Sequence, residues 1–317
     1  MSALICGSMA FDNIMVFEGR FREHILPDQI HILNIAFLVP EVRREFGGCA
    51  GNIAYNLKLL GGEPLIMATV GDDFGTYRTR LERLGMNLGL VRGIDGLLTA
   101  QAYITTDLDD NQITAFHPGA MNESHRTQVP DLTGIESAGI SIAIVSPDGS
   151  VGMRDHAAQL HAAGIPFIFD PGQQLPTFDG ADLRQFVELA NWVAVNSYEA
   201  HLLAERTGWN EQELASRVEA LIVTRGADGS TIWAGGERHE IPPVKPAAIN
   251  DPTGCGDAYR AGLLHGIDRR HSWPETGRLA SLLGALKIAH RGTQNHQFTP
   301  ESLQKDYRKA FGHELRI

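Results

Sequence analysis

The sequence predicts an α/β protein whose doubly wound, mainly parallel sheet is flanked by helices and carries a small β-sheet lid. Short apolar runs alternate with amphipathic stretches along most of the 317 residues, a pattern typical of βα units that build a parallel sheet. The apolar runs are almost continuous, as expected of strands that are buried on both faces. Two regions depart from this alternation, and they predict the lid.

Six apolar runs predict the strands of the large sheet: ALIC at 3–6, PLIMATV at 64–70, ISIAIV at 140–145, PFIFD at 166–170, WVAVN at 192–196 and LIVTR at 221–225. Helical patterns lie between them. In MRDHAAQLHAAG, Ala157, Leu160 and His161 share one face and Gly164 is the expected stop. Residues 273–312 predict helices separated by the turn-rich segment RGTQNHQFTP.

The lid is predicted from residues 13–46, which contain HILNIAFLV, and from residues 98–122. In the second segment, LTAQAYITTD and QITAFHPGAM predict a hairpin around DLDDN. The chain has no internal repeat, low-complexity tract or long polar linker. We therefore expect residues 1–317 to form a single domain.

Composition argues against several kinds of partner. The net charge is −11 with interspersed charges, which predicts no nucleic-acid partner. Three cysteines without a CxxC pair indicate reduced thiols, and neither a charged N-terminal start nor a long apolar run is present. We therefore expect a cytoplasmic protein with no membrane partner. The 13 histidines lack metal-ligand spacing, so no structural metal is predicted.

The stretch AAINDPTGCGDAYRAGLLHGI at 247–267 runs through a glycine-rich turn into an amphipathic helix. Gly254 and Gly256 allow a tight turn that presents backbone N–H groups to an anion at the helix N-terminus. Asp257 follows at once and could accept the proton of an attacking hydroxyl. The alternative is that Asp257 only caps the helix and the glycines only turn the chain.

A second glycine-rich turn precedes a helix in EFGGCAGNIAYNLKLLGG at 45–62. Gly47 and Gly48 would let a flat or polyhydroxylated ligand approach the main chain. Asn52 can both donate to and accept from sugar hydroxyls. By itself this stretch could also serve helix packing.

Together the two motifs resemble the ribokinase (PfkB) family over essentially the whole chain. GGCAGN is similar to its first signature, and DPTGCGD to its second, usually written DTTGAGD. The resemblance implies a ribokinase-like fold and an ATP-dependent kinase, with Asp257 as general base and the 254–257 backbone as anion hole. Pro252 and Cys255 depart from the signature. Pro252 lacks an N–H but precedes the glycine turn, and the N–H of Cys255 is expected to stay available.

Other positions follow the same resemblance. In GSMAFDNI, Asp12 is implied to hold two ribose hydroxyls. VNSYEA places Asn196 with the ATP site and Glu199 near Mg²⁺ through water. VTRGADGS resembles a segment that contacts ATP, with Thr224, Gly226 and Gly229. The resemblance also allows a monovalent cation such as K⁺. The alternatives are ordinary strand-end polar residues and a hairpin turn.

The substrate class depends on two further segments. Phe116 in ITAFHPGAM could stack on a purine, and Gln173 or Gln174 in IFDPGQQLP could pair with its edge. These segments and the tail GTQNH resemble bacterial adenosine and nucleoside kinases. Alternatively, Phe116 packs within the lid and the glutamines face water. A sugar kinase and a non-catalytic ligand-binding sensor therefore remain as alternatives. A dinucleotide-binding protein is not supported, because no GxGxxG follows the first strand. A homodimer through the lid is also allowed.

Overall fold

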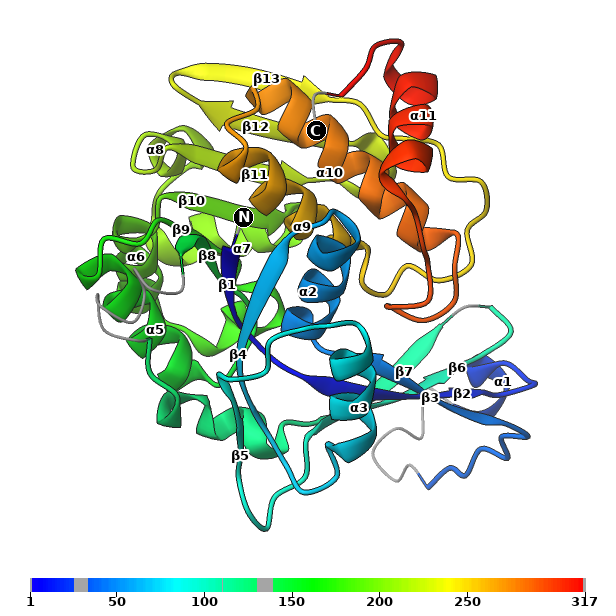
Figure 1. Ribbon diagram of the computed structural model, residues 1–317. Coiled ribbons are helices and arrows are strands. Elements are labelled where there is room, and N and C mark those ends of the chain that lie inside the picture. The colour runs from blue at the N-terminus through cyan, green and yellow to red at the C-terminus, as the bar shows by residue number, and fades with distance from the viewer. Residues whose placement is uncertain (1, 26–33, 110, 130–138, 316–317) are drawn as a thin grey trace.

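The computed structural model describes residues 2–25, 34–109, 111–129 and 139–315. Within these residues the chain forms one nine-stranded sheet and one four-stranded sheet (Figure 1). The strands of the large sheet are β1 (Ser2–Cys6), β4 (Glu63–Val70), β5 (Val91–Gly93), β8 (Ile140–Val145), β9 (Phe167–Phe169), β10 (Trp192–Asn196), β11 (Ala220–Thr224), β12 (Ser230–Ala234) and β13 (Glu237–Ile241). The helices are α1 (Phe21–His24), α2 (Cys49–Leu59), α3 (Gly75–Arg83), α5 (Ser150–Ala162), α6 (Gly180–Leu189), α7 (Ser197–Thr207), α8 (Glu211–Ala215), α9 (Cys255–Asp268), α10 (Trp273–Ile288) and α11 (Pro300–Phe311).

The large sheet has the order β13-β12-β11-β10-β9-β8-β1-β4-β5. Every pairing from β5 to β11 is parallel, whereas β12 and β13 add an antiparallel hairpin at one edge. All six predicted strands are confirmed to within a residue or two. Because the strands are parallel, the polar residues that follow them gather at one edge of the sheet.

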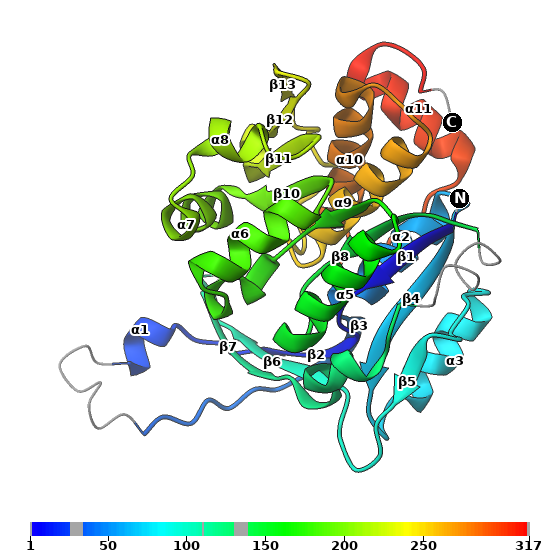
Figure 2. The ribbon, with the colours of Figure 1, turned by 90° about the vertical axis from the view of Figure 1, so that its left-hand side faces the viewer.

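Helices cover both faces of the large sheet (Figures 1 and 2). Alternate residues of β1 belong to different cores: Ala3 and Ile5 pack with α2, α3, α9, α10 and α11, and Leu4 and Cys6 with α5, α6, α7 and α8. The continuous apolar runs thus reflect burial on both sides. In the part of the chain that the structure describes, no helix is both long and apolar enough to cross a membrane.

The helix predicted near residue 153 is α5, and Gly164 ends it as expected, with a φ of 69°. Ala157 and Leu160 are buried, whereas His161 on the same helix is exposed. His161 lies in the last turn, and its ring contacts the carbonyl of Leu189 at the protein surface. The helices and the turn predicted for residues 273–312 are confirmed as α10 and α11.

The small sheet has the order β3-β2-β6-β7, with β2 (Ala10–Val16), β3 (Val42–Gly47), β6 (Ala100–Thr106) and β7 (Gln112–His117). Figure 2 shows these strands and α1 extending beyond the main body. The hairpin of β6 and β7 lies where LTAQAYITTD and QITAFHPGAM predict it, although residue 110 of DLDDN lies outside the described residues. Residues 34–39 of HILNIAFLV form no strand, and residues 31–33 lie outside the described part.

Candidate active site

The N-terminus of α9 presents free backbone N–H groups at the edge of the large sheet. Gly254 adopts a left-handed φ of 80° and turns the chain into the helix. The N–H of Cys255 was expected to be free, but it donates to the carbonyl of Pro252 at 3.2 Å and closes the turn. Among the described residues, the N–H groups of Gly254, Gly256 and Asp257 have no acceptor. These three can therefore bind the oxygens of an anion.

Asp257 is held by a hydrogen bond that joins α9 to α2. The Nδ2 of Asn52 donates to its Oδ2 at 2.8 Å, and the Oδ1 of Asn52 accepts from Nε2 of Gln294 at 3.0 Å. The same Nε2 reaches the hydroxyl of Tyr77, which donates to the carbonyl of Gly47 at 3.0 Å. Asn52 thus positions Asp257, and its predicted contact with sugar hydroxyls stays a prediction.

The turn before α2 has no room for a side chain. A Cβ on Gly48, which has a φ of 88°, would lie 2.5 Å from the backbone N of Ala10 and the carbonyl oxygen of Ser8. A Cβ on Gly47 would lie 2.4 Å from Oδ2 of Asp12. Both glycines therefore let the main chain pass close to the start of the small sheet.

Burial raises the pKa of Asp257 to about 6. The hydrogen bond from Asn52 and the charge of Arg260 act in the opposite direction, while the carboxylate of Asp170 raises the pKa further. A carboxylate with this pKa is ionised at neutral pH and still has a useful affinity for a proton. Asp257 is therefore suited to act as a general base.

A buried ion pair that the sequence does not predict lies close to Asp257. The guanidinium of Arg260, one turn further along α9, donates to Asp170 at 2.9 Å and to the carbonyl of Ala194 at 3.2 Å. Asp170 follows β9 at the same edge of the sheet. The pair links α9 to the end of β9 and to the middle of β10, and its opposite charges act on Asp257 in opposite directions.

Asp12 lies on β2 and is almost completely buried. Burial, followed by the charges of Asp257, Asp251 and Glu45, raises its pKa to about 7. In the part of the chain that the structure describes, no protein group donates a hydrogen bond to its carboxylate. Asp12 is thus a buried acceptor within electrostatic reach of Asp257, available to hydroxyl donors of a ligand.

Phe116 shares a face of the small sheet with Asp12. Asp12 pairs with Ala102 on β6, and Ala102 pairs with Phe116 on β7, and residues directly opposite in paired strands project from the same face. Phe116 is 45% exposed, so it does not pack in a core within the small sheet. Two strand spacings of about 4.8 Å separate the backbones of Asp12 and Phe116, with a small alanine between them.

Gln173 is exposed in the short 3₁₀ helix Gly172–Thr177 that follows β9. Gln174 is half-buried, and its carbonyl accepts from the hydroxyl of Thr177 at 2.7 Å. The two glutamines therefore differ, because Gln174 takes part in a local turn and Gln173 extends into solvent. The role predicted for Gln173 stays a prediction.

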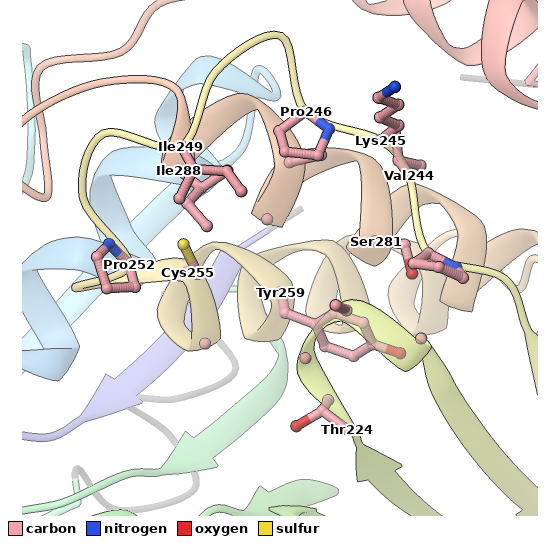
Figure 3. Close-up of a pocket in the computed structure, with 17 residues that line it drawn as sticks. Thr224, Val244, Lys245, Pro246, Ile249, Pro252, Cys255, Tyr259, Ser281 and Ile288 are labelled. Atoms are coloured by element: carbon pink, nitrogen blue, oxygen red, sulfur yellow. The ribbon is translucent and has the colours of Figure 1, made fainter.

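A pocket of about 550 Å³ lies on the other side of the α9 N-terminus (Figure 3). Three of the four predicted ATP residues, Thr224, Gly226 and Gly229, line it together with Cys255 and Gly256, whereas Asn196 does not. Its wall is mostly apolar and comes from the segment after β13 and from α10: Val244, Pro246, Ile249 and Ile288. The anion-binding turn therefore lies between this pocket and the Asp12 face of the small sheet.

Asn196 and Glu199 form a capping box at the start of α7. The Oδ1 of Asn196 accepts from the N–H of Glu199 at 2.9 Å, and Oε2 of Glu199 accepts from the N–H of Asn196 at 2.8 Å. Burial, with a contribution from Asp170, raises the pKa of Glu199. Among the described residues no group of three His, Cys, Asp or Glu surrounds a common point. The donors thus fit Mg²⁺ only as an ion that water and phosphates complete.

Residues 14–300 match the profile of the pfkB family carbohydrate kinases. The chain is 54% identical to the nucleoside kinase of Burkholderia thailandensis, solved in complex with inosine, over 98% of this chain and 99% of that one, with a TM-score of 0.89. A complex of that enzyme described as ADP-inosine gives 55% identity, coverage of 99% and 97%, and a TM-score of 0.87. The nucleoside kinase of Methanocaldococcus jannaschii is 29% identical over 83% of this chain and 85% of its own.

We predict that Asp257→Asn keeps the fold and ligand binding but lowers turnover about 10²-fold or more, because only the general base is lost. Steady-state kinetics and binding by calorimetry separate the two effects. Asp268→Asn at the other end of α9 is the control and should leave turnover unchanged. Near-normal turnover of Asp257→Asn would rule out the base, and a loss of affinity alone would make Asp257 a binding residue.

The hydrogen bond from Asn52 lowers the pKa of Asp257, so Asn52→Leu should raise it. As a general base Asp257 would be active in its ionised form, so turnover should fall as pH drops through this pKa. The acid limb of kcat should therefore move to higher pH by about one unit, which corresponds to the loss of one hydrogen bond to a charged group.

The matched control is Asn56→Leu, one turn along α2, where the buried amide contacts His296 and the carbonyl of Asn52. It should lower thermal stability without moving the acid limb. If both variants move the limb equally, the pH effect reports general damage to α2 rather than the bond to Asp257.

Proposed function

Because this chain belongs to the pfkB family of carbohydrate kinases, we propose that it is an ATP-dependent nucleoside kinase. It would transfer the γ-phosphoryl group of ATP to the 5′-hydroxyl of a purine nucleoside. The observation that carries this proposal is the row of Asp12, Ala102 and Phe116 on one face of the small sheet. Across this row, the carboxylate of Asp12 would bind ribose hydroxyls, the small Ala102 leaves space, and the ring of Phe116 would stack on the nucleobase.

The proposed chemistry divides between a base and an anion hole. Asp257 takes the proton of the 5′-hydroxyl as the oxygen attacks the γ-phosphorus, and ADP leaves with the electrons of the broken P–O bond. The N–H groups of Gly254, Gly256 and Asp257 stabilise the charge on the transferred oxygens. Asn52 keeps the carboxylate of Asp257 turned toward the acceptor. Asp12 accepts hydrogen bonds from the ribose hydroxyls and so orients the 5′-hydroxyl.

ATP is assigned to the 550 Å³ pocket that Thr224, Gly226 and Gly229 line. Its apolar wall suits an adenine ring, and the phosphates then reach the N-terminus of α9. Mg²⁺ would neutralise phosphate charge, with Glu199 holding it through water and Asn196 fixing Glu199. K⁺ is left out of the proposal, because a lysine ammonium already lies beside Asp251.

The purine preference is supported by Phe116 and by the solved relative from Burkholderia thailandensis, which is described in complex with inosine. Adenosine is an expected substrate together with inosine and guanosine, because the amide of Gln173 can present either a donor or an acceptor to the base. A nucleoside preference does not follow from the family alone, since the family description names carbohydrate kinases.

The small sheet serves in this proposal as a lid over the nucleoside and as a dimer surface. On the face opposite Asp12, Val42, Tyr103 and Ile113 are exposed apolar side chains. Such a face can pair with the same face of a second copy. A cytoplasmic location is supported by Cys6, Cys49 and Cys255, which are all free thiols.

The experiment that tests the proposal is ADP release measured across adenosine, inosine, guanosine, cytidine, ribose and a hexose. A purine nucleoside should give the highest kcat/KM. A preference for free ribose would make the protein a sugar kinase. Binding of a nucleoside without ADP release would make it a ligand-binding sensor.

Asp12→Ala should raise the nucleoside KM strongly and reduce discrimination between ribosides and deoxyribosides, because the ribose hydroxyls then lack their acceptor. The measurement is the ratio of kcat/KM for adenosine and 2′-deoxyadenosine, or for inosine and 2′-deoxyinosine, in both proteins. An unchanged ratio would contradict the assignment of Asp12.

Phe116→Ala should lower kcat/KM for purine nucleosides by about one to two orders of magnitude, since stacking of a base on an aromatic ring contributes about 1 to 3 kcal/mol. The KM of ATP should stay nearly unchanged. Ile113→Ala is the matched control, because Ile113 is also 45% exposed on β7 but projects from the other face. Equal losses for ribose and adenosine in Phe116→Ala would place the ring in packing instead.

Gln173→Leu should change the preference among adenosine, inosine and cytidine, because a base edge then faces an apolar side chain. Steady-state kinetics with the three nucleosides measure the change. Gln174→Leu, at the neighbouring amide that belongs to the local turn, should leave the preference as it is. The assignment is wrong if Gln173→Leu has the preference of the wild type.

A further inference from the structure

Lys287 is a fully buried lysine beside the turn that leads into α9. Its side chain is 0% exposed, near the C-terminal end of α10. The ammonium donates to the carbonyl of Asp251 at 2.6 Å and lies 3.4 Å from the carbonyl of His290. The carboxylate oxygen Oδ1 of Asp251 lies 3.9 Å away. The ammonium thus meets oxygen atoms that can only accept hydrogen bonds.

The same aspartate holds the anion-binding turn in place. Oδ1 of Asp251 accepts from the N–H of Thr253 at 2.9 Å, and Oδ2 accepts from the N–H of Gly292 at 2.9 Å. The N–H of Asp251 also reaches the carbonyl of Ile288 at 3.2 Å. Lys287 therefore contacts a residue that fixes both the entry into α9 and the loop after α10.

The surroundings of Lys287 are those of a cation site. Burial lowers the pKa of Lys287, but the charges of Asp251, Cys255 and Asp257 act in the opposite direction. Three donors facing two carbonyls and a carboxylate favour the ammonium form, and the C-terminal end of α10 adds partial negative charge. Backbone carbonyls are also the oxygens that bind K⁺ in proteins. The ammonium of Lys287 therefore occupies the oxygens that could otherwise bind a K⁺ ion.

From this geometry we infer that the ammonium of Lys287 takes the place of a bound monovalent cation. Lys287 is thus a positioning residue that holds the turn from Asp251 to Gly256 in the shape that binds phosphate. The inference rests on the proposed function, since it assigns phosphoryl transfer to this turn. The family resemblance allows a requirement for K⁺, whereas this inference predicts that the protein does not need K⁺. Lys287 touches neither substrate and acts only through Asp251 and the turn.

The first test uses the wild-type protein with the best acceptor from the substrate panel. Turnover should change less than about twofold when K⁺ and NH₄⁺ are replaced by tetramethylammonium. A requirement for K⁺ would overturn the inference even if no variant could be made. If no acceptor releases ADP, the proposed function fails, and that outcome is separate from any cation effect.

The second test compares Lys287→Ala with Lys287→Met. Alanine leaves a space that NH₄⁺, methylammonium or K⁺ can enter, whereas methionine fills it with an apolar chain. Both variants should lose about tenfold or more in kcat in tetramethylammonium buffer. Only Lys287→Ala should regain turnover with NH₄⁺, methylammonium or K⁺. Lys58→Ala is the control, because the ammonium of Lys58 contacts Glu63 at the surface, and its turnover should not respond.

Thermal melting and ATP titration of each variant separate structure from positioning. Loss of turnover that no cation restores, with a melting temperature lowered equally in both variants, would make Lys287 a structural residue only. Full turnover of Lys287→Ala without added cation would also overturn the inference. If Lys287→Ala folds only when methylammonium is present, recovery of its circular dichroism spectrum measures the replacement of the Lys287 ammonium by the added cation.

Discussion

The hydrogen bond from Asn52 to Asp257 joins two helices that cover the same face of the large sheet. The arrangement of the other residues of the site depends on this bond. Helices α2 and α9 each begin at a glycine-rich turn with a positive φ, at Gly48 and Gly254. One turn brings the main chain close to Asp12, and the other exposes backbone N–H groups that can bind an anion. Because Asn52 Nδ2 and Asp257 Oδ2 are only 2.8 Å apart, the two turns are held in a fixed relation, so a ligand that the proposed function places on Asp12 would face Asp257.

Local patterns in the sequence predicted much of this arrangement. Strands buried on both faces have a distinctive apolar run, and glycine-rich turns before helices can be seen without knowledge of tertiary contacts. The antiparallel strands β12 and β13 were not predicted. The edge strand β13, ERHEI, has one apolar residue and so shows no apolar alternation. The predicted lid segment around HILNIAFLV gave no strand over residues 34–39, since apolar composition alone does not supply a pairing partner.

The missed site residues share a different cause. Gln294 lies 242 residues from Asn52, and Lys287 lies 36 residues from Asp251. A long-range bond from an amide or an ammonium leaves no local period in the sequence. The weak signal for Gln294 was its place in GTQNH, and the signal for Arg260 and Lys287 was a basic residue within an otherwise apolar helix face. Such residues are worth testing as buried partners of nearby carboxylates.

Asp12 and Asp257 influence each other through their charges, and a bound nucleoside would change that influence. Asp12 is buried and Asp257 is half-buried, and the charge of Asp257 helps to raise the pKa of Asp12 to about 7. Hydroxyl donors of a ribose favour the ionised form of Asp12. A second negative charge held nearby then increases the proton affinity of Asp257, because two carboxylates in a shared environment resist full ionisation. In the proposed function, binding of a ribose at Asp12 would therefore raise the proton affinity of Asp257 when the hydroxyl is in place, and would couple recognition of the ribose to removal of its proton.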